Sequence, residues 1–123
     1  MNGGPMMANF NKVTIADNAR TELHDQLSLT GAEISINHLP AGASVPFVHA
    51  HKNNEEIYGI LEGKGKAVID GETVELSAGD WLYAAPAARR RFFAAEDTPI
   101  RFICVQVKAN SLGDYTKEDA IVD

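Results

Sequence analysis

Short runs of alternating apolar and polar residues follow one another along the chain, separated by clusters of glycine, proline, asparagine and aspartate. The clusters recur about every 8 to 12 residues or closer, a spacing typical of antiparallel sandwiches and barrels. No long stretch shows the period of about 3.6 residues that marks an amphipathic helix. The pattern therefore predicts an all-β domain. Its predicted strands are residues 33–39, 46–51, 56–61, 66–69, 72–76, 81–85, 91–94 and 100–107.

Turn signals between these runs support the same outline. The glycine-rich residues 62–65 are predicted to form a hairpin turn. Asp70 and Gly71 give a second and stronger hairpin signal, because glycine adopts positive φ angles at no steric cost. Residues 17–25 are compatible with one or two helical turns.

The length of 123 residues fits one domain. Residues 1–10 lack periodicity and are expected to form a flexible lead-in, followed by a single domain over residues 11–123. The polar tail after Asn110 is expected to pack loosely or to wrap a partner subunit.

Composition and charge exclude several classes of protein. Eleven Lys and Arg against seventeen Asp and Glu give a formal charge of −6, which argues against binding to nucleic acid. No apolar run approaches the roughly 20 residues needed to cross a bilayer, so no membrane association is expected. The single cysteine, Cys104, cannot form an internal disulfide, which fits a reducing compartment and a cytoplasmic location.

Two histidines and a glutamate are the main candidates for chemistry. His49 and His51 are two residues apart, so on a strand both imidazoles face the same side. Glu56 and Tyr58 share one face of the next predicted strand. If the two faces meet inside a barrel, two imidazoles and one carboxylate can hold a divalent metal ion and leave coordination positions open.

The spacing of these residues resembles the first cupin motif, G(X)5HXH(X)3,4E(X)6G. Six residues separate Gly42 from His49, four separate His51 from Glu56, and six separate Glu56 from Gly63. The resemblance implies an RmlC-like jelly-roll barrel, also called a double-stranded β-helix. It also implies a homodimer, and a divalent metal ion (Fe, Mn, Ni, Cu or Zn) bound by His49, His51 and Glu56.

The second cupin motif, G(X)5PXG(X)2H(X)3N, is only partly present. Gly79 and Pro86 fit its first glycine and its proline with one extra residue between them, and Ala88 replaces its second glycine. On this alignment Arg91 stands where the family has its fourth metal ligand, a histidine. Arginine neither coordinates a metal ion nor loses its charge. Arg91 is therefore expected to repel a metal ion, to pair with Glu56, or to hold an anionic substrate beside a metal with three protein ligands.

Strand alternation and the motif together suggest the remaining pocket residues. Arg91 and Tyr58 are the candidates for a catalytic role and for the pocket wall. Trp81 and Tyr83 share a face near the barrel mouth, where they form either an aromatic wall or ordinary core packing. His38 shares a face with two isoleucines, and either enters the cavity as an extra ligand or base or bonds to a loop.

Two main functional hypotheses follow from these residues. The first is an enzyme whose metal acts as a Lewis acid or oxygen-activating centre on a small oxygenated organic molecule, in a dioxygenase, isomerase or lyase type of reaction. The second is a binding module without metal or catalysis, in which Arg91 anchors a small anionic sugar or organic acid. A third reading gives the domain no small-molecule chemistry and lets it act through its dimer surface.

Overall fold

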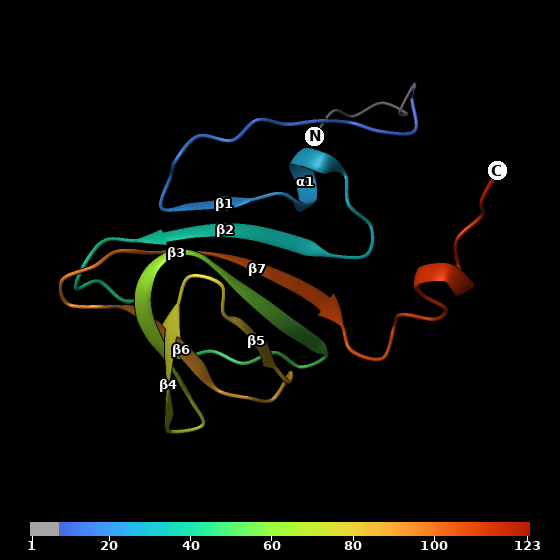
Figure 1. Cartoon of the computed structure of the whole chain (residues 1–123). Helices are drawn as coiled ribbons and strands as arrows, with labels where there is room; N and C mark the ends of the chain where they lie inside the picture. The colour runs from blue at the N-terminus through green and yellow to red at the C-terminus, as the bar shows by residue number, and fades with distance from the viewer. Residues whose placement is uncertain (1–7) are drawn as a thin grey trace.

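The computed structural model describes residues 8–123, and seven antiparallel strands curl around one interior (Figure 1). One short helix and one 3-10 turn complete the described elements. In chain order these elements are β1 (Arg20–Glu22), α1 (His24–Leu27), β2 (Glu33–Leu39), β3 (Asn54–Ile69), β4 (Glu72–Ser77), β5 (Trp81–Ala84), β6 (Arg90–Ala94), β7 (Ile100–Lys108) and η1 (Thr116–Glu118).

The long strand β3 joins the two halves of the barrel. Its first part lies between β7 and β5 in a sheet whose order is β1-β2-β7-β3-β5. Its second part lies between β4 and β6 in the opposite half. In Figure 1 the strand curves visibly as it passes from one half to the other. The all-β jelly-roll predicted from the sequence is confirmed.

The prediction of a hairpin turn at residues 62–65 is wrong. β3 runs through this segment without reversing, and only its register against β7 shifts, between Ile60 and Glu62. Gly63 has a φ of +83°, and a Cβ atom there would lie 1.7 Å from the carbonyl oxygen of Pro99. The glycines therefore permit an irregularity in one strand and a close approach of a second backbone, rather than a turn.

Other local predictions had mixed outcomes. The turn at Asp70 and Gly71 is confirmed, since both residues have positive φ angles, as a type I′ hairpin requires. Residues 46–51 form no regular strand and meet β6 only through an isolated bridge between His49 and Arg90. Residues 17–25 contain the strand β1 and only the first two residues of α1, instead of one or two helical turns.

The strand β2 reverses the usual relation between hydrophobicity and burial. Ser35 and Asn37 face the interior and are buried, whereas Ile34 and Ile36 face outward and are only half-buried. Much of the interior beside them is aromatic, with the rings of Phe92 and Phe102 stacked 5.0 Å apart. Leu39, at the end of the same inward face, is apolar and lines the interior, so the reversal concerns the middle of β2.

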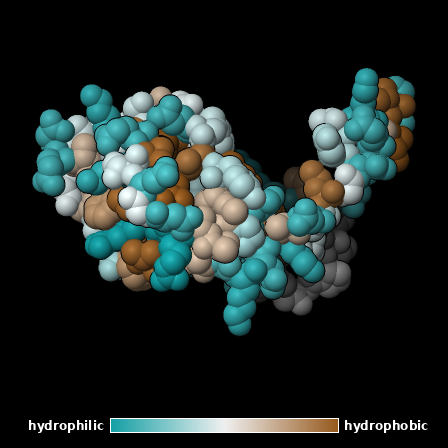
Figure 2. Space-filling view, turned by 90° about the horizontal axis from the view of Figure 1, so that it is seen from below, coloured by the Kyte–Doolittle hydropathy of each residue, from teal (hydrophilic) through white to brown (hydrophobic). Residues whose placement is uncertain are grey.

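The C-terminal end of the chain lies away from the barrel interior (Figure 1). After β7 the chain forms an arm that reaches clear of the barrel and carries exposed hydrophobic side chains, among them Ile121, which is 94% exposed (Figure 2). Of the segment predicted to be flexible, residues 1–10, positions 1–7 lie outside the described residues. In the part of the chain that the structure describes, no helix is long and apolar enough to cross a bilayer.

Candidate functional site

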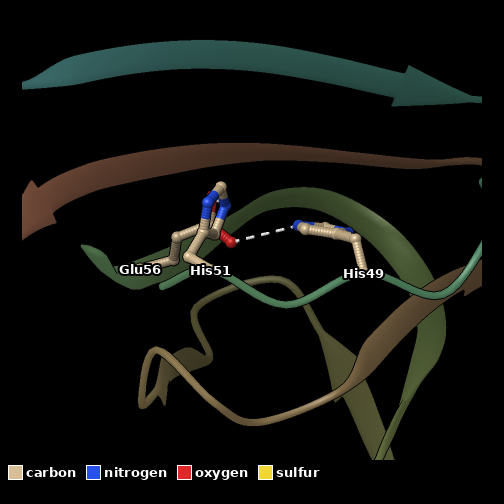
Figure 3. Close-up of side chains that lie close together, drawn as sticks. All are labelled: His49, His51 and Glu56. Carbon is tan, nitrogen blue, oxygen red and sulfur yellow. Dashed lines mark ion pairs between the residues drawn. The ribbon is translucent and has the colours of Figure 1, made fainter. Parts of the chain in front are cut away.

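Three side chains from two parts of the fold converge inside the barrel (Figure 3). His49 and His51 lie on the extended segment that precedes β3, and Glu56 lies near the start of β3. His49 Nε2 is 3.4 Å from Glu56 Oε1, and His51 Nε2 is 3.3 Å from Glu56 Oε2. One ligand atom from each residue lies within 4.8 Å of the other two.

The spacing of these atoms fits a divalent metal ion. Two donors that each lie about 2.0 to 2.1 Å from a tetrahedral zinc ion are separated by about 3.4 Å. The two histidine-to-carboxylate distances are close to this value. Two imidazoles and one carboxylate are also a donor set that accepts several first-row metals and leaves positions open for a substrate.

Glu56 is held as a buried carboxylate by two neighbours in the barrel wall. The hydroxyl of Tyr58 donates to Oε1, and the thiol of Cys104 donates to Oε2 at 3.3 Å. Burial raises the pKa of Glu56, but these two hydrogen bonds, together with the charges of His51 and Arg90, outweigh burial. The pKa of Glu56 therefore lies below its usual value, and the side chain is ionised near neutral pH.

Three groups around Glu56, namely His49, Tyr58 and Cys104, are neutral near neutral pH. Burial lowers the pKa of His49, so its imidazole is unprotonated near neutral pH, as metal ligation requires. Burial and the nearby Glu56 raise the pKa of Cys104 to about 12 and also raise the pKa of Tyr58. Both groups therefore act as hydrogen-bond donors, and Cys104 is not a nucleophile.

The guanidinium beside the site belongs to Arg90. Its side chain is fully buried, and its Nε lies 3.7 Å from Glu56 Oε1. One terminal nitrogen donates to the carbonyl oxygen of Ala85 at 3.0 Å. Among the described residues, Nε and Nη1 of Arg90 have no hydrogen-bond partner. The charge of Arg90 is thus directed at the carboxylate rather than at solvent.

The prediction that Arg91 occupies the pocket is wrong. Arg91 alternates with Arg90 on β6 and points away from the cavity, where its Nε donates to the carbonyl oxygen of Val45 at 2.7 Å and its guanidinium lies over the ring of Phe93. Inward and outward positions differ by one residue along a strand, so an error of one in alignment selects the wrong arginine.

The three converging side chains open into a cavity of about 630 Å³. Tyr58, Phe92 and Phe102 form part of an apolar wall, and Ser35 and Asn37 form a polar wall on β2. A cavity of this size and mixed character suits a small organic ligand.

Comparison with known proteins identifies the family. The family model described as a cupin domain matches residues 35–106, more than half of the chain. The chain belongs to the cupin family.

Solved structures place this cupin among close relatives. A cupin protein from Bacteroides fragilis is 63% identical, with a TM-score of 0.93 over 95% of this chain and 99% of that one. A protein from Thermotoga maritima described as a predicted oxalate decarboxylase is 29% identical, with a TM-score of 0.57 over 61% of this chain and 64% of that one. A curated relative from Methanocaldococcus jannaschii, named an uncharacterized protein, is 32% identical over 66% of this chain. That match spans only 60% of the relative's length.

The second cupin motif contains the signal for the correct arginine. Counting five residues from Gly79 without an insertion reaches Ala85, so the proline position holds alanine. The position of the fourth metal ligand, a histidine in the motif, then falls on Arg90. The match of Pro86 to the motif proline shifted the alignment by one residue and led to Arg91.

Three other pocket predictions for this cupin are corrected by the structure. Trp81 and Tyr83 lie on the outer face of β5 and are 67% and 57% exposed, so they form neither a cavity wall nor core packing. His38 faces outward from β2, and its Nδ1 lies 3.4 Å from Asp17 in the loop before β1, so of its two expected placements the contact with a loop is the one observed. The apolar face of β2 was expected to point inward, whereas the polar face does.

Sequence reasoning missed further residues that contact the site or line its cavity. Cys104 reads as an inert residue of an apolar strand, although it donates to Glu56. Ser35 and Asn37, which line the cavity, were not among the predicted pocket residues. The recurrence of small polar residues at alternate positions of β2 was the available signal for a polar cavity wall.

Proposed function

We propose that this cupin binds a divalent metal ion through His49, His51 and Glu56 and acts on a small oxygenated organic molecule in the cavity. The observation that carries the proposal is the convergence of both imidazoles on the two oxygens of a single buried carboxylate. Iron, manganese, nickel, copper and zinc are the candidate metals. Such an ion would supply Lewis-acid or oxygen-activating chemistry.

The chain's own residues support this role in distinct ways. Tyr58 and Cys104 each donate one hydrogen bond to Glu56, which holds the carboxylate in one orientation without removing its charge. His49 offers a neutral imidazole. Because Arg90 stands in place of a fourth protein ligand, the remaining coordination positions are left to the substrate and water, while the apolar wall limits access of solvent.

The reaction class we propose is of the dioxygenase, isomerase or lyase type. The relative from Thermotoga maritima, described as a predicted oxalate decarboxylase, supports a small organic acid as the substrate. Of these three reaction types, the description of that relative favours a lyase reaction on such an acid.

A metal-free binding module is the second candidate function. It is favoured by Arg90, whose Nε already lies 3.7 Å from Glu56 and provides a cationic partner for the carboxylate. In this case the cavity would hold a small anionic sugar or organic acid without catalysis.

Metal content separates the two candidates. We expect the purified protein, reconstituted with each candidate metal, to retain one divalent ion per chain by elemental analysis. A variant with both His49→Ala and His51→Ala is expected to bind the metal at least about 100-fold more weakly, because it lacks two of the three donors. The matched control carries His24→Ala and His38→Ala, which removes two histidines outside the cavity and leaves the metal content unchanged.

Absence of metal from the wild-type protein after reconstitution would exclude the metalloenzyme and favour the binding module. Full retention of metal in the variant that lacks His49 and His51 would show that the bound ion lies elsewhere on the chain.

We also propose that this cupin forms a homodimer in the cytoplasm through the outer face of β2, β7, β3 and β5. Side chains from these strands form two cross-strand apolar rows. One row consists of Ile34, Val105, Ile57 and Tyr83 in register, and the other of Ile36, Ile103 and Trp81, with Gly59 between the last two. We call the whole set the outer belt; it consists of Ile34, Ile36, Ile57, Trp81, Tyr83, Ile103 and Val105. Contiguous apolar patches on a protein surface mark interaction sites, and a two-fold symmetric partner would cover the patch on both copies at once.

A further inference from the structure

The inner face of β2 carries hydrogen-bonding side chains where a barrel interior normally carries apolar ones. Ser35 and Asn37 are 2% and 8% exposed and line the cavity. Asn37 Nδ2 donates to Ser35 Oγ at 3.0 Å, and Arg20 Nη1 on β1 donates to Asn37 Oδ1 at 2.7 Å. Arg20 also lines the cavity. We call Arg20, Asn37 and Ser35 the polar strip.

The polar strip offers mainly donors to the cavity. Its internal bonds engage the oxygens of Asn37 and Ser35, which leaves the hydroxyl hydrogen of Ser35, a second amide hydrogen of Asn37 and further N–H groups of Arg20. Arg20 Nη2 also lies 3.2 Å from Glu22 Oε2, but both side chains are more than half exposed, so solvent weakens this pair. A set of donors that ends in a guanidinium is suited to a carboxylate.

The polar strip and the candidate metal ligands line the same cavity. Ser35 lies directly across from Cys104 in the pairing of β2 with β7, and the thiol of Cys104 donates to Glu56 Oε2 at 3.3 Å. Arg20, Ser35 and Cys104 line this cavity together with Glu56. The cavity thus has a cationic end at its mouth and the histidine–glutamate cluster deeper inside.

We propose that the polar strip binds the carboxylate end of a small organic acid whose other, oxygenated end reaches His49, His51 and Glu56. The inference deepens the proposed function and rests on it for the second end of the ligand. It assigns to Arg20 the recognition of the anionic group that the sequence had assigned to Arg91.

Sheet pairing indicates the shape of the ligand. Asn37 pairs with Phe102 on β7, and Phe102 pairs with Ile60 on β3, four residues from Glu56. The backbone positions of Asn37 and Glu56 are therefore offset across the sheet by two strand spacings, or about 10 Å, and along the strands by about 13 Å. A ligand that contacts both ends of the cavity must be an extended acid with an oxygen function at each end.

Glutarate is a suitable probe because it carries two carboxylates on a five-carbon chain. We would measure its dissociation constant by calorimetry on cobalt-loaded protein. Arg20→Gln is expected to weaken glutarate binding at least about tenfold, and Ser35→Ala about three- to tenfold, because a charged and a neutral hydrogen bond are lost. Arg101→Gln is the matched control, since it removes the same charge from the outer face of β7 and should change the affinity less than about twofold.

The absorption spectrum of bound cobalt separates this inference from the proposed function. If cobalt binds and glutarate affinity is equal in Arg20→Gln and Arg101→Gln, or if glutarate does not bind the wild type at millimolar concentration, the polar strip is not an anion site. If cobalt does not bind, the metal site fails. Loss of glutarate affinity in Arg20→Gln of the metal-free protein would then still support the polar strip, and equal affinity would overturn it.

Discussion

At the scale of single residues, one carboxylate organises the site. Glu56 accepts hydrogen bonds from Tyr58 and Cys104, faces two imidazoles and lies beside the buried Arg90. A buried carboxylate is stable only when such partners compensate for lost hydration. The surrounding groups therefore keep Glu56 charged with or without a metal ion.

The pKa of His49 depends on both its burial and the charge of Glu56. Burial lowers the pKa of His49, whereas the charge of Glu56 raises it, so Glu56→Gln is expected to lower the pKa further. An NMR titration of the metal-free protein, with His49→Ala to assign the resonance, measures the change. Glu62→Gln is the control, because Glu62 is exposed and pairs with Arg101 instead.

The lowered pKa of His49 also determines how the free energy of unfolding changes with pH. Because the pKa of His49 is lower in the folded than in the unfolded chain, the unfolded chain binds more protons below a pH of about 6.5. The free energy of unfolding should therefore decrease as the pH falls from about 6.5 through the folded pKa. A rise in the pKa of His49 in Glu56→Gln would contradict this account of the site.

At the scale of elements, β3 depends on glycine where a second backbone comes close. Gly63 and Gly71 both have a φ of +83°, but only at Gly63 would a Cβ atom meet a neighbour, the carbonyl oxygen of Pro99 at 1.7 Å. We expect Gly71→Ala to cost about 1 kcal/mol from backbone conformation alone. Gly63→Ala should cost about 3 kcal/mol or more, because the barrel must also shift.

Urea denaturation of both variants measures the difference between their free energies of unfolding. Gly71→Ala is the control for Gly63→Ala, because the two glycines have the same φ angle. Similar losses of stability in both variants would mean that the close approach to Pro99 relaxes without cost.

The elements also show which parts of the fold the sequence could predict. The boundaries of β2 are as predicted, and those of β4 to β7 agree to within one residue at each end, because alternation and turn residues mark them locally. The continuity of β3 was missed because a glycine pair reads as a turn unless the packing partner is known. The prediction of which face of β2 points into the barrel was wrong, because alternation separates the two faces of a strand but does not indicate which one lies inside.

For the candidate site, motif spacing predicted the residues whose positions depend on neighbours in sequence. His49, His51 and Glu56 lie together as expected. Arg90 was missed through a shift of one residue, and Cys104 because its contact with Glu56 joins two strands that are distant in sequence. A contact between strands that are distant in sequence, such as that of Cys104 with Glu56, forms only when the barrel closes, so motif spacing does not predict it.

At the scale of the whole molecule, the outer belt predicts self-association. We expect the wild type to sediment as a dimer, and Val105→Lys, which places a charge at the centre of the outer belt, to weaken association at least about tenfold. Analytical ultracentrifugation over a concentration series measures this effect. Thr73→Lys adds the same charge on β4, away from the outer belt, and should leave the dimer intact.

A wild-type protein that sediments as a monomer at all concentrations would contradict the dimer. Equal weakening by both lysine variants would mean that the interface is not the outer belt.

The two sides of the site differ in how firmly the fold holds them, and this affects the kinetics of ligand exchange. Glu56 belongs to a strand paired on both edges, with β5 and with β7, so its backbone can open only when the barrel opens. His49 and His51 lie on a segment held by the bridge to Arg90 and by a bond from His51 to Pro86. Entry and release of an ion or substrate should therefore follow the local breathing of the histidine segment, while the carboxylate remains a fixed point throughout the exchange.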